Sequence, residues 1–241
     1  MYSVAPAMSD ISAAFVSAVG LVFALDAELG SIVLLSLRVS LSAVLIASLI
    51  GLPLGAALAV FRFPGRRAVI VAVNSLMGLP PVVVGLVLYL MLSRSGPFGV
   101  FGLLFTPTAM IIAQSILLTP LIAALARQLV EDMWAEYEEQ LRSLGAGPGR
   151  ALRTLLWDGR FSLLTAVLAG FGRAIAEVGA VMIVGGNIDK VTRVMTTAIA
   201  LETSKGDLAL ALGLGIILIA LALAINATAF SINLVLRARG A

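Results

Sequence analysis

Long apolar segments, separated by short polar intervals, run through most of this chain. A helix needs about 20 apolar residues to cross a bilayer. The segments that approach or exceed this length are residues 31–61, 68–92, 107–125, 161–184 and 208–236. The pattern predicts an all-α polytopic membrane protein with about five transmembrane helices, a membrane domain over residues 31–236 and a short tail at 237–241.

The N-terminal segment, residues 1–30, has a shorter apolar stretch at 11–25 and no basic residue. It therefore lacks the positively charged start of a secretory signal. Acidic residues on both sides of the stretch favour a helix that lies at the outer surface of the membrane. A sixth, strained span is the alternative.

Two neighbouring prolines, Pro80 and Pro81, interrupt the second apolar segment. Each proline removes an amide donor and disfavours a helical residue before it. We expect the helix to be kinked or briefly unwound at this point.

The polar interval at residues 128–160 departs most clearly from the apolar pattern. Its sequence, QLVEDMWAEYEEQLRSLGAGPGRALRTLLWDGR, passes from acidic to basic residues around a glycine-rich turn. Helix-forming residues flank this turn, and the apolar Leu152, Leu155, Leu156 and Trp157 are expected to anchor the second helix against the membrane domain. The interval is predicted to be a docking element for a partner in water; an ordinary solvated loop is the alternative.

The basic residues decide the orientation of the chain. If five spans alternate in direction, ten arginines share one side of the membrane: Arg62, Arg66, Arg67, Arg127, Arg142, Arg150, Arg153, Arg160, Arg237 and Arg239. The other side has four basic residues: Arg94, Lys190, Arg193 and Lys205. Because positive charge accumulates in cytoplasmic loops, we expect the N-terminus outside the cell and the polar interval and C-terminus inside. The net charge of +3 then reflects topology, and no nucleic-acid partner is expected.

The composition excludes several kinds of chemistry. Only 12% of the residues are charged, against about 25% in soluble domains. The chain has no Cys and no His, so we expect no disulfide, no thiol or imidazole catalysis and no His/Cys metal site. Its lysines, Lys190 and Lys205, do not follow the glycine pattern of a P-loop. We therefore expect no catalytic residue, metal or cofactor on this chain; if transport is ATP-driven, another chain hydrolyses the ATP.

Arg173 and Glu177 lie in the fourth apolar segment, four positions apart and so on one face of a helix. Either charge would be costly against lipid, which turns both toward the protein interior or a water-filled path. A structural ion pair is the favoured interpretation. A translocation path that tolerates an anion is the alternative.

The outer polar interval, residues 185–206, is net basic and is predicted to be a loop. It offers contacts for an anion or for an acidic extracytoplasmic partner, at Asn187, Lys190, Arg193 and Lys205. A solvated loop without a binding role is the alternative.

The cytoplasmic polar interval resembles a loop of the permease subunits of ATP-binding-cassette (ABC) importers, which carries an E-A-A pattern, three further residues and a glycine. Glu139 and Gly145 match this pattern and its spacing, whereas both alanines are replaced. The resemblance implies a coupling helix that inserts into a groove of an ATPase subunit. The coupling positions that it implies are Glu138, Glu139, Arg142, Leu144, Gly145 and Ala146.

Further blocks resemble the tungstate-type permeases of the molybdate, tungstate and sulfate group. They are residues 77–86, 92–97, 106–110, 172–188 and 196–207. The resemblance implies the transmembrane domain of a type I ABC importer in the cytoplasmic membrane of a prokaryote, which moves tungstate or, as second choice, molybdate. It also implies a homodimer of permease subunits, two cytoplasmic ATPase subunits that bind ATP and magnesium, and an extracytoplasmic substrate-binding protein.

Two other classes of protein stay open. A secondary transporter or channel would need its own coupling site, for which Arg173 and Glu177 are the candidates. A membrane enzyme would need a reactive group of side chains, yet neither lysine lies in a predicted span. Dependence of transport on a separate ATPase distinguishes an importer subunit from both.

Overall fold

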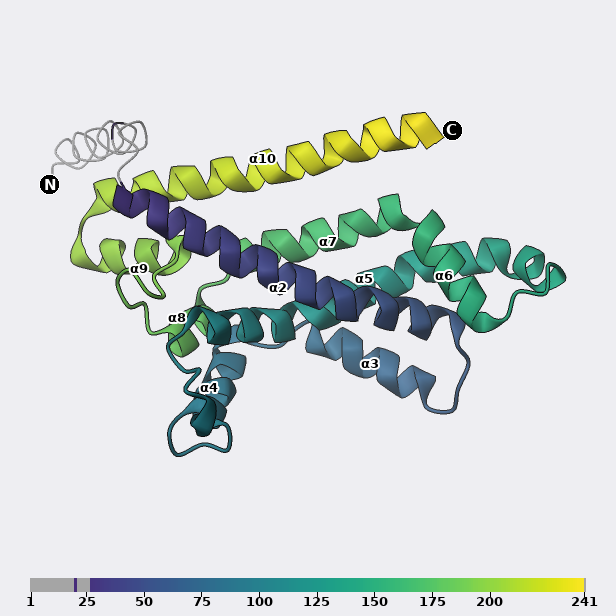
Figure 1. Cartoon of the computed structure of the whole chain (residues 1–241), viewed down its shortest axis with the longest axis horizontal. Coiled ribbons are helices and arrows are strands. Elements are labelled where there is room, and N and C mark those ends of the chain that lie inside the picture. Colours follow the sequence, from purple (N-terminus) through teal and green to yellow (C-terminus); the bar gives the residue numbers. More distant parts are fainter. Residues whose placement is uncertain (1–19, 21–26, 241) are drawn as a thin grey trace, which may run out of the picture.

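The computed structural model describes Gly20 and residues 27–240, with side chains described for Gly20 and residues 29–231. Apart from Gly20, the predicted interfacial helix at 11–25 lies outside the described residues. The elements, labelled as in Figure 1, are α2 (Ala27–Val60), α3 (Arg66–Leu76), α4 (Pro81–Leu92), η1 (Gly99–Phe101), α5 (Pro107–Ser143), α6 (Pro148–Asp158), α7 (Arg160–Ile175), α8 (Gly179–Gly185), α9 (Met195–Lys205) and α10 (Leu208–Gly240). All of these elements are helical, which confirms the predicted all-α class for the described part of the chain.

Three of these helices, α2, α5 and α10, are each long and apolar enough to cross a membrane. Two pairs reach that length only together: α3 with α4, bent by 97°, and α7 with α8, bent by 57°. By length and composition, the described residues therefore contain three helices that could cross a membrane, or up to five segments if each bent pair counts as one.

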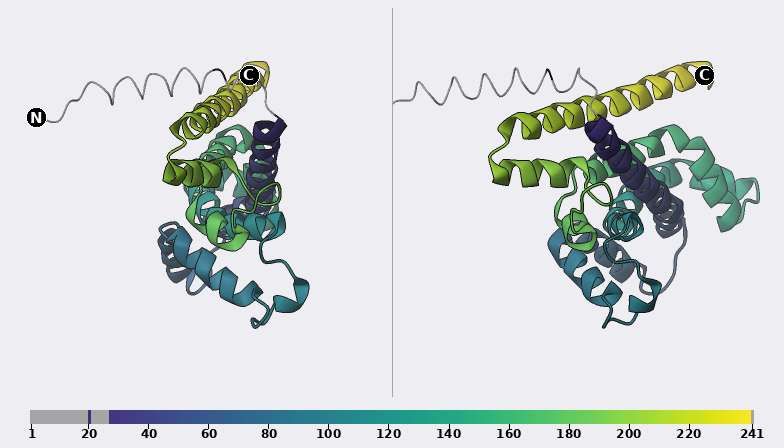
Figure 2. Two further views of the ribbon diagram at one scale, coloured as in Figure 1. Left: turned by 90° about the vertical axis from the view of Figure 1, so that its left-hand side faces the viewer. Right: turned by 60° about the vertical axis from the view of Figure 1, so that its left-hand side comes forward.

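The long helices lie lengthwise in an elongated bundle (Figure 1). One end of the bundle holds the last turns of α2, α5 and α10, the start of α3 and all of α6, whereas α8, α9 and the first turns of α2 and α10 lie at the other end. Figure 2 shows α10 on one flank of the bundle and the pair α3 and α4 on the opposite flank. The basic turn after α2 and most of the interval at residues 128–160 therefore lie at the first end, and the interval that contains α9 lies at the other.

Glycines let α2 and α5 approach each other closely. A side-chain carbon on Gly55 would lie 2.3 Å from the carbonyl oxygen of Ala123, and one on Gly51 would lie 3.0 Å from that of Thr119. Apolar side chains of five helices continue this contact in the core: Ala43, Ala47, Leu118, Phe171, Met195 and Leu214. Small residues at helix contacts are typical of membrane proteins, where close backbone approach replaces the hydrophobic effect as a source of stability.

The fourth apolar segment, predicted as a span over residues 161–184, is divided into two helices, α7 and α8. At the break between α7 and α8, the side-chain amide of Gln114 donates to the carbonyl oxygen of Ala174 at 3.0 Å. The hydroxyl of Thr196 donates to the carbonyl oxygen of Glu177 at 2.8 Å. These donors satisfy carbonyls that a continuous helix would bond internally, so the backbone is free to bend inside the protein.

The outer interval, predicted as a polar loop over residues 185–206, contains helix α9. The amide of Met195, the first residue of α9, donates to the hydroxyl oxygen of Ser36 on α2 at 2.8 Å. Glu202 is buried in the last turns of the helix and pairs with Lys205 at 2.8 Å. The interval is therefore a packed part of the bundle, because α9 is bonded to α2 and the buried Glu202 has a partner within the protein.

Candidate functional site

Helix α5 carries the cytoplasmic polar interval away from the membrane core. Thr106 caps its start by accepting a 3.3 Å hydrogen bond from the amide of Ala109, and Pro107 occupies the first turn, where no amide donor is required. At 1.5 Å per residue the helix is roughly 55 Å long, well beyond the roughly 30 Å thickness of the hydrocarbon core. One continuous helix therefore connects the buried core to an exposed polar end. We call residues 128–158, which comprise this end, the turn after it and α6, the polar hairpin.

The polar hairpin turns at Gly145. The amide of Gly145 donates to the carbonyl oxygen of Arg142 at 3.0 Å, and that of Ala146 donates to the carbonyl oxygen of Leu141 at 2.9 Å. Together these bonds form a Schellman motif, which closes a helix and requires a left-handed residue after the cap. Gly145 has a φ of +70°, a conformation that strains any residue with a side chain. The glycine of the E-A-A pattern therefore has a definite structural role, which is to end α5 at the tip.

Helix α6 fastens the polar hairpin to the bundle. Ala151 and Leu155 are buried against the end of α2, the middle of α5 and the start of α7. The residues around them are Ala56, Val60, Ala126, Val130 and Leu163. Trp157, predicted to help anchor this helix, is instead 67% exposed, and the guanidinium of Arg160 lies 4.7 Å from its ring centre. The leucine face of α6 thus packs inward, while the tryptophan faces outward.

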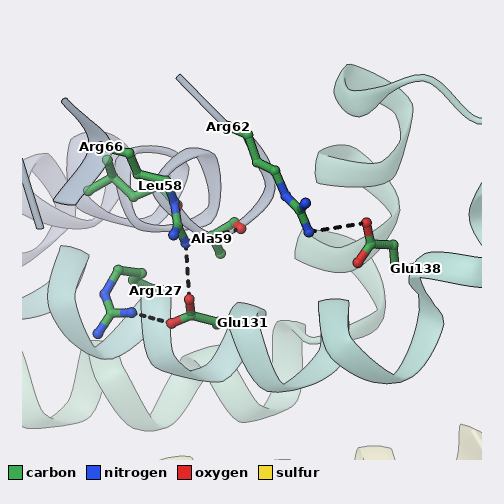
Figure 3. A network of polar contacts seen from close by, with 7 residues as sticks. All are labelled: Leu58, Ala59, Arg62, Arg66, Arg127, Glu131 and Glu138. Carbon is green, nitrogen blue, oxygen red and sulfur yellow. Dashed lines mark hydrogen bonds and ion pairs between the residues drawn. The ribbon is translucent and has the colours of Figure 1, made fainter. Parts of the chain in front are cut away.

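Ion pairs tie the polar hairpin to the basic turn between α2 and α3 (Figure 3). The guanidinium of Arg66 donates to the carbonyl oxygen of Leu58 at 2.6 Å and to the Glu131 carboxylate at 3.0 Å. The other carboxylate oxygen of Glu131 accepts from Arg127 on the same helix. Arg66 therefore satisfies a carbonyl at the end of α2, which has no partner within the helix, and at the same time holds α5.

Glu138 and Glu139 are adjacent in sequence but have different surroundings. The Glu138 carboxylate lies 2.5 Å from Arg142 and 3.7 Å from Arg62. Glu139 is exposed and takes part in none of the ion pairs among the described residues. Leu144, beside the turn, is 80% exposed. The tip therefore presents an unpaired carboxylate and an exposed apolar side chain, a combination that suits a protein partner.

The breaks in the two interrupted helices lie against each other at the surface of the subunit. Pro80 is extended, with φ −65° and ψ 120°, and Pro81 is the first residue of α4. The start of α8 lies against the start of α4, because a side-chain carbon on Gly179 would be 3.0 Å from Cγ2 of Val82. The interruptions of two different membrane segments therefore lie side by side.

Arg173 and Glu177 form an ion pair next to this break, with 2.7 Å between Nη1 and Oε2. The other oxygen of Glu177 accepts a 3.2 Å hydrogen bond from the amide of Ala180, in the first turn of α8. The side chain of Glu177 is 4% exposed, whereas that of Arg173 is 42% exposed. Glu177 is thus a buried partner for the start of α8, and Arg173 presents its remaining N–H donors at the surface of the subunit.

Asn187 and Arg193, two of the predicted outer contacts, are engaged within the protein. Arg193 pairs with Asp189 at 3.0 Å, and its side chain is 16% exposed. The side-chain amide of Asn187 donates to the carbonyl oxygen of Thr197 at 3.4 Å. Both residues hold together the segment that connects α8 to α9.

The two lysines of the outer end are more accessible. Lys190 is exposed, and Lys205 is 53% exposed although it pairs with Glu202. These two side chains are therefore the cations of the α8–α9 region that a partner or an anion reaches most easily.

The sequence alone does not predict the contact between Arg66 and Glu131. A signal was present, since a basic residue shortly after the end of a helix often binds the last carbonyls of that helix. The partner carboxylate lies far along the chain, however, so only the fold reveals the pair. Within the described residues, no group of three or more His, Cys, Asp or Glu side chains could hold a metal ion.

Comparison with known proteins finds that this chain is similar to membrane components of transport systems. The family of binding-protein-dependent transport system inner membrane components matches residues 51–239. The chain is 42% identical over 200 residues to the tungstate uptake system permease protein TupB of Peptoclostridium acidaminophilum, a match that covers 83% of this chain and 88% of that protein. It is 42% identical over 183 residues to a probable anion ABC transporter permease protein of Haloferax volcanii, covering 74% and 79%. Identity to the molybdenum transport system permease protein ModB of Escherichia coli is 31% over 175 residues, which cover 69% of this chain and 76% of that protein.

Proposed function

Since the chain belongs to the family of binding-protein-dependent transport system inner membrane components, we propose that it is the permease subunit of an ATP-driven importer for tungstate. The family places the protein in the inner membrane as part of an ABC transport system. Orientation follows from charge: the end of the bundle with the polar hairpin faces the cytoplasm, and the end with α9 faces outward.

The continuity of α5 is the observation that carries this proposal. One helix runs from the packed core, where Ile122 and Ala123 are buried on the C-terminal side of Pro120, to the exposed tip at Ser143. A rigid helix transmits a displacement of its tip to the core without loss in a flexible joint. An ATPase that binds the tip and changes conformation would therefore move the membrane segments directly.

The docking surface that we propose comprises Glu138, Glu139, Arg142, Leu144, Gly145 and Ala146. Leu144 would enter an apolar groove of the ATPase, because its side chain is almost fully exposed at the tip. Glu139 would meet a donor of the partner, whereas Glu138 keeps its contacts with Arg142 and Arg62. Gly145 acts indirectly, by fixing the direction in which this surface points.

ATP and magnesium would bind to the ATPase subunits and not to this chain. Neither Lys190 nor Lys205 follows a P-loop pattern, and both belong to the outer end of the bundle. The permease would thus have no catalytic role of its own and would convert closure of the ATPase into movement of its helices.

We further propose that two copies of the chain form a two-fold dimer and enclose the path between them. Arg173 is the candidate contact for the anion, because its guanidinium is partly exposed beside the break between α7 and α8. A two-fold axis would bring two such groups to one path, which suits an oxyanion with two negative charges. A guanidinium that is already paired with Glu177 still donates further charge-assisted hydrogen bonds.

Delivery from outside would depend on an extracytoplasmic substrate-binding protein. Lys190 and Lys205 are accessible at the outer end and would attract acidic groups of that protein. The choice of tungstate rests on relatives: identity is 42% to a tungstate permease and 31% to a molybdenum permease.

The substrate is tested by transport in proteoliposomes that contain this permease, its ATPase and its binding protein. Tungstate, molybdate and sulfate would be offered in turn at equal concentration, and ATP-dependent uptake of each would be measured. We expect tungstate to be taken up fastest. Equal rates for tungstate and sulfate would contradict the proposed substrate while leaving the transport mechanism intact.

A further inference from the structure

The basic turn between α2 and α3 forms a hollow of about 320 Å³, lined by Arg62, Phe63, Gly65, Arg66 and Arg67. The side chain of Arg62 is 79% exposed, and its carboxylate neighbour Glu138 is 3.7 Å away. Arg67 is exposed and takes part in none of the ion pairs among the described residues. The hollow therefore contains guanidinium donors that the carboxylates of the protein do not satisfy.

The surroundings leave the hollow positively charged. Two carboxylates, those of Glu131 and Glu138, are shared among four arginines: Arg62, Arg66, Arg127 and Arg142. Arg67 adds one more positive charge without a further carboxylate. Guanidinium groups bind phosphate through paired N–H donors, so the geometry favours an anionic ligand with several oxygens.

The depth of the hollow points to a lipid as the source of that anion. Helix α2 is apolar enough to span a membrane up to its last residue, Val60, and the basic turn follows it directly, so this turn is the first polar part of the chain after the apolar span. Phe61 and Phe63 flank Arg62 and are 39% and 41% exposed. Exposed phenylalanine rings beside arginines are typical of segments that lie at the boundary between acyl chains and headgroups, which is where a phospholipid has its phosphate.

The exposed face of α3 extends the hollow with an apolar surface. Its exposed side chains include Val69 at 38%, Val71 at 64% and Leu76 at 43%. The acyl chains of a lipid whose headgroup occupies the hollow would cover this face. A soluble phosphate or an acidic peptide would leave it bare, so the combination of charge and apolar surface favours a phospholipid.

We propose that residues 62–67 bind the headgroup phosphate of an anionic phospholipid in the cytoplasmic leaflet. Arg62 and Arg67 contact the phosphate, while Arg66 shapes the turn through its bonds to Leu58 and Glu131. Basic pockets on the cytoplasmic side of membrane helices bind such headgroups for the same electrostatic reason. Because Arg62 also pairs with Glu138, the bound lipid lies directly beside the polar hairpin.

Lipid binding is measured on the purified full-length chain, without any transport assay. The chain is titrated with phosphatidylglycerol and separately with phosphatidylcholine, and native mass spectrometry gives the dissociation constant of the first bound lipid. We expect phosphatidylglycerol to bind more tightly. Arg67→Gln removes no ion pair, so it should leave the fold intact and weaken phosphatidylglycerol binding several-fold; Arg62→Gln/Arg67→Gln should weaken it roughly tenfold.

Arg150→Gln/Arg153→Gln is the matched control, because it removes the same charge from exposed positions of α6 at the same end of the bundle. We expect this control to bind phosphatidylglycerol as the unaltered chain does. Equal weakening in both double variants would mean a general charge effect and would overturn the site, as would unchanged binding in Arg67→Gln. Loss of ATPase binding in Arg62→Gln/Arg67→Gln with unchanged lipid affinity would identify the hollow as a protein contact and would also overturn the proposal.

Discussion

The carbonyl oxygen of Leu141 accepts a 2.9 Å hydrogen bond from the amide of Ala146. Between these residues the backbone passes through Gly145 at φ +70°, and the bond closes α5 at the tip of the polar hairpin. The direction in which Leu144 is exposed to a partner therefore depends on a backbone turn that a glycine permits. The apolar core lies elsewhere, so the turn and the core are expected to respond separately to substitution.

Gly145→Val should uncouple the permease from its ATPase while leaving it inserted. A side chain at this left-handed position costs about 1–2 kcal/mol, so the turn is expected to reorganise and ATP-dependent uptake to fall by roughly tenfold. Gly147→Val is the control, since Gly147 has φ −68° and a side-chain carbon there would meet no atom within 4 Å. Similar losses in both variants, measured as uptake per inserted protein, would argue against a special role for the turn.

The ion pair between Arg173 and Glu177 predicts that substitutions of these residues affect the stability of the protein and its transport rate differently. Arg173→Gln alone leaves a buried carboxylate without its cation. This change should lower the free energy of unfolding by about 3 kcal/mol. Arg173→Gln/Glu177→Gln should recover most of that stability, because the amide oxygen of the new glutamine still accepts from Ala180.

Transport by the double variant then decides the role of Arg173. If its guanidinium contacts the anion, uptake should stay low although the protein is stable. Recovery of uptake together with thermal stability would identify the pair as purely structural.

Single cysteines should report the orientation of the bundle without interference, because the chain has no native Cys. Ser143 at the end of α5 and Ser204 near the end of α9 are both exposed and belong to opposite ends of the bundle. A membrane-impermeant maleimide added to intact cells should label Ser204→Cys and should reach Ser143→Cys only after permeabilisation. Labelling of both from the same side would refute the proposed topology.

The close contact between α2 and α5 predicts that a glycine-to-alanine change at Gly55 destabilises the protein, although alanine usually stabilises a helix. Alanine is a better helix former than glycine by about 1 kcal/mol. Gly55→Ala should nevertheless destabilise the protein by about 1–3 kcal/mol, since the added carbon would lie 2.3 Å from the carbonyl oxygen of Ala123.

Gly30→Ala is the control for this change, because an added carbon there would meet no atom within 4 Å. It should leave the midpoint of thermal unfolding in detergent unchanged or raise it slightly. A stabilising effect of Gly55→Ala would show that the two helices are not in close contact.

The structural features that the sequence predicts are those that depend on a single segment of the chain and not on its contacts with other segments. Apolar length identifies a membrane-crossing helix before any contact is known, and the prolines Pro80 and Pro81 stand at the break between α3 and α4. The spacing from Glu139 to Gly145 likewise reflects a local motif, the closing turn of one helix.

The features that sequence did not predict depend on contacts between distant segments. The break between α7 and α8 uses donors from Gln114 and Thr196, and neither is near it in sequence. Trp157 was expected to anchor α6, but hydrophobicity alone does not reveal which side of a helix finds a partner surface. The role of Arg66 in holding α5 depends on the fold, because only the folded chain brings the Glu131 carboxylate within 3.0 Å of its guanidinium.

In the proposed mechanism, a separate ATPase drives this permease from the cytoplasmic side. The most direct test is tungstate accumulation in proteoliposomes that hold the permease with ATP inside and the substrate-binding protein outside, measured with and without the ATPase subunits. We expect accumulation above the external concentration only when ATPase and ATP are both present. Accumulation against the gradient by the permease without its ATPase would contradict this mechanism.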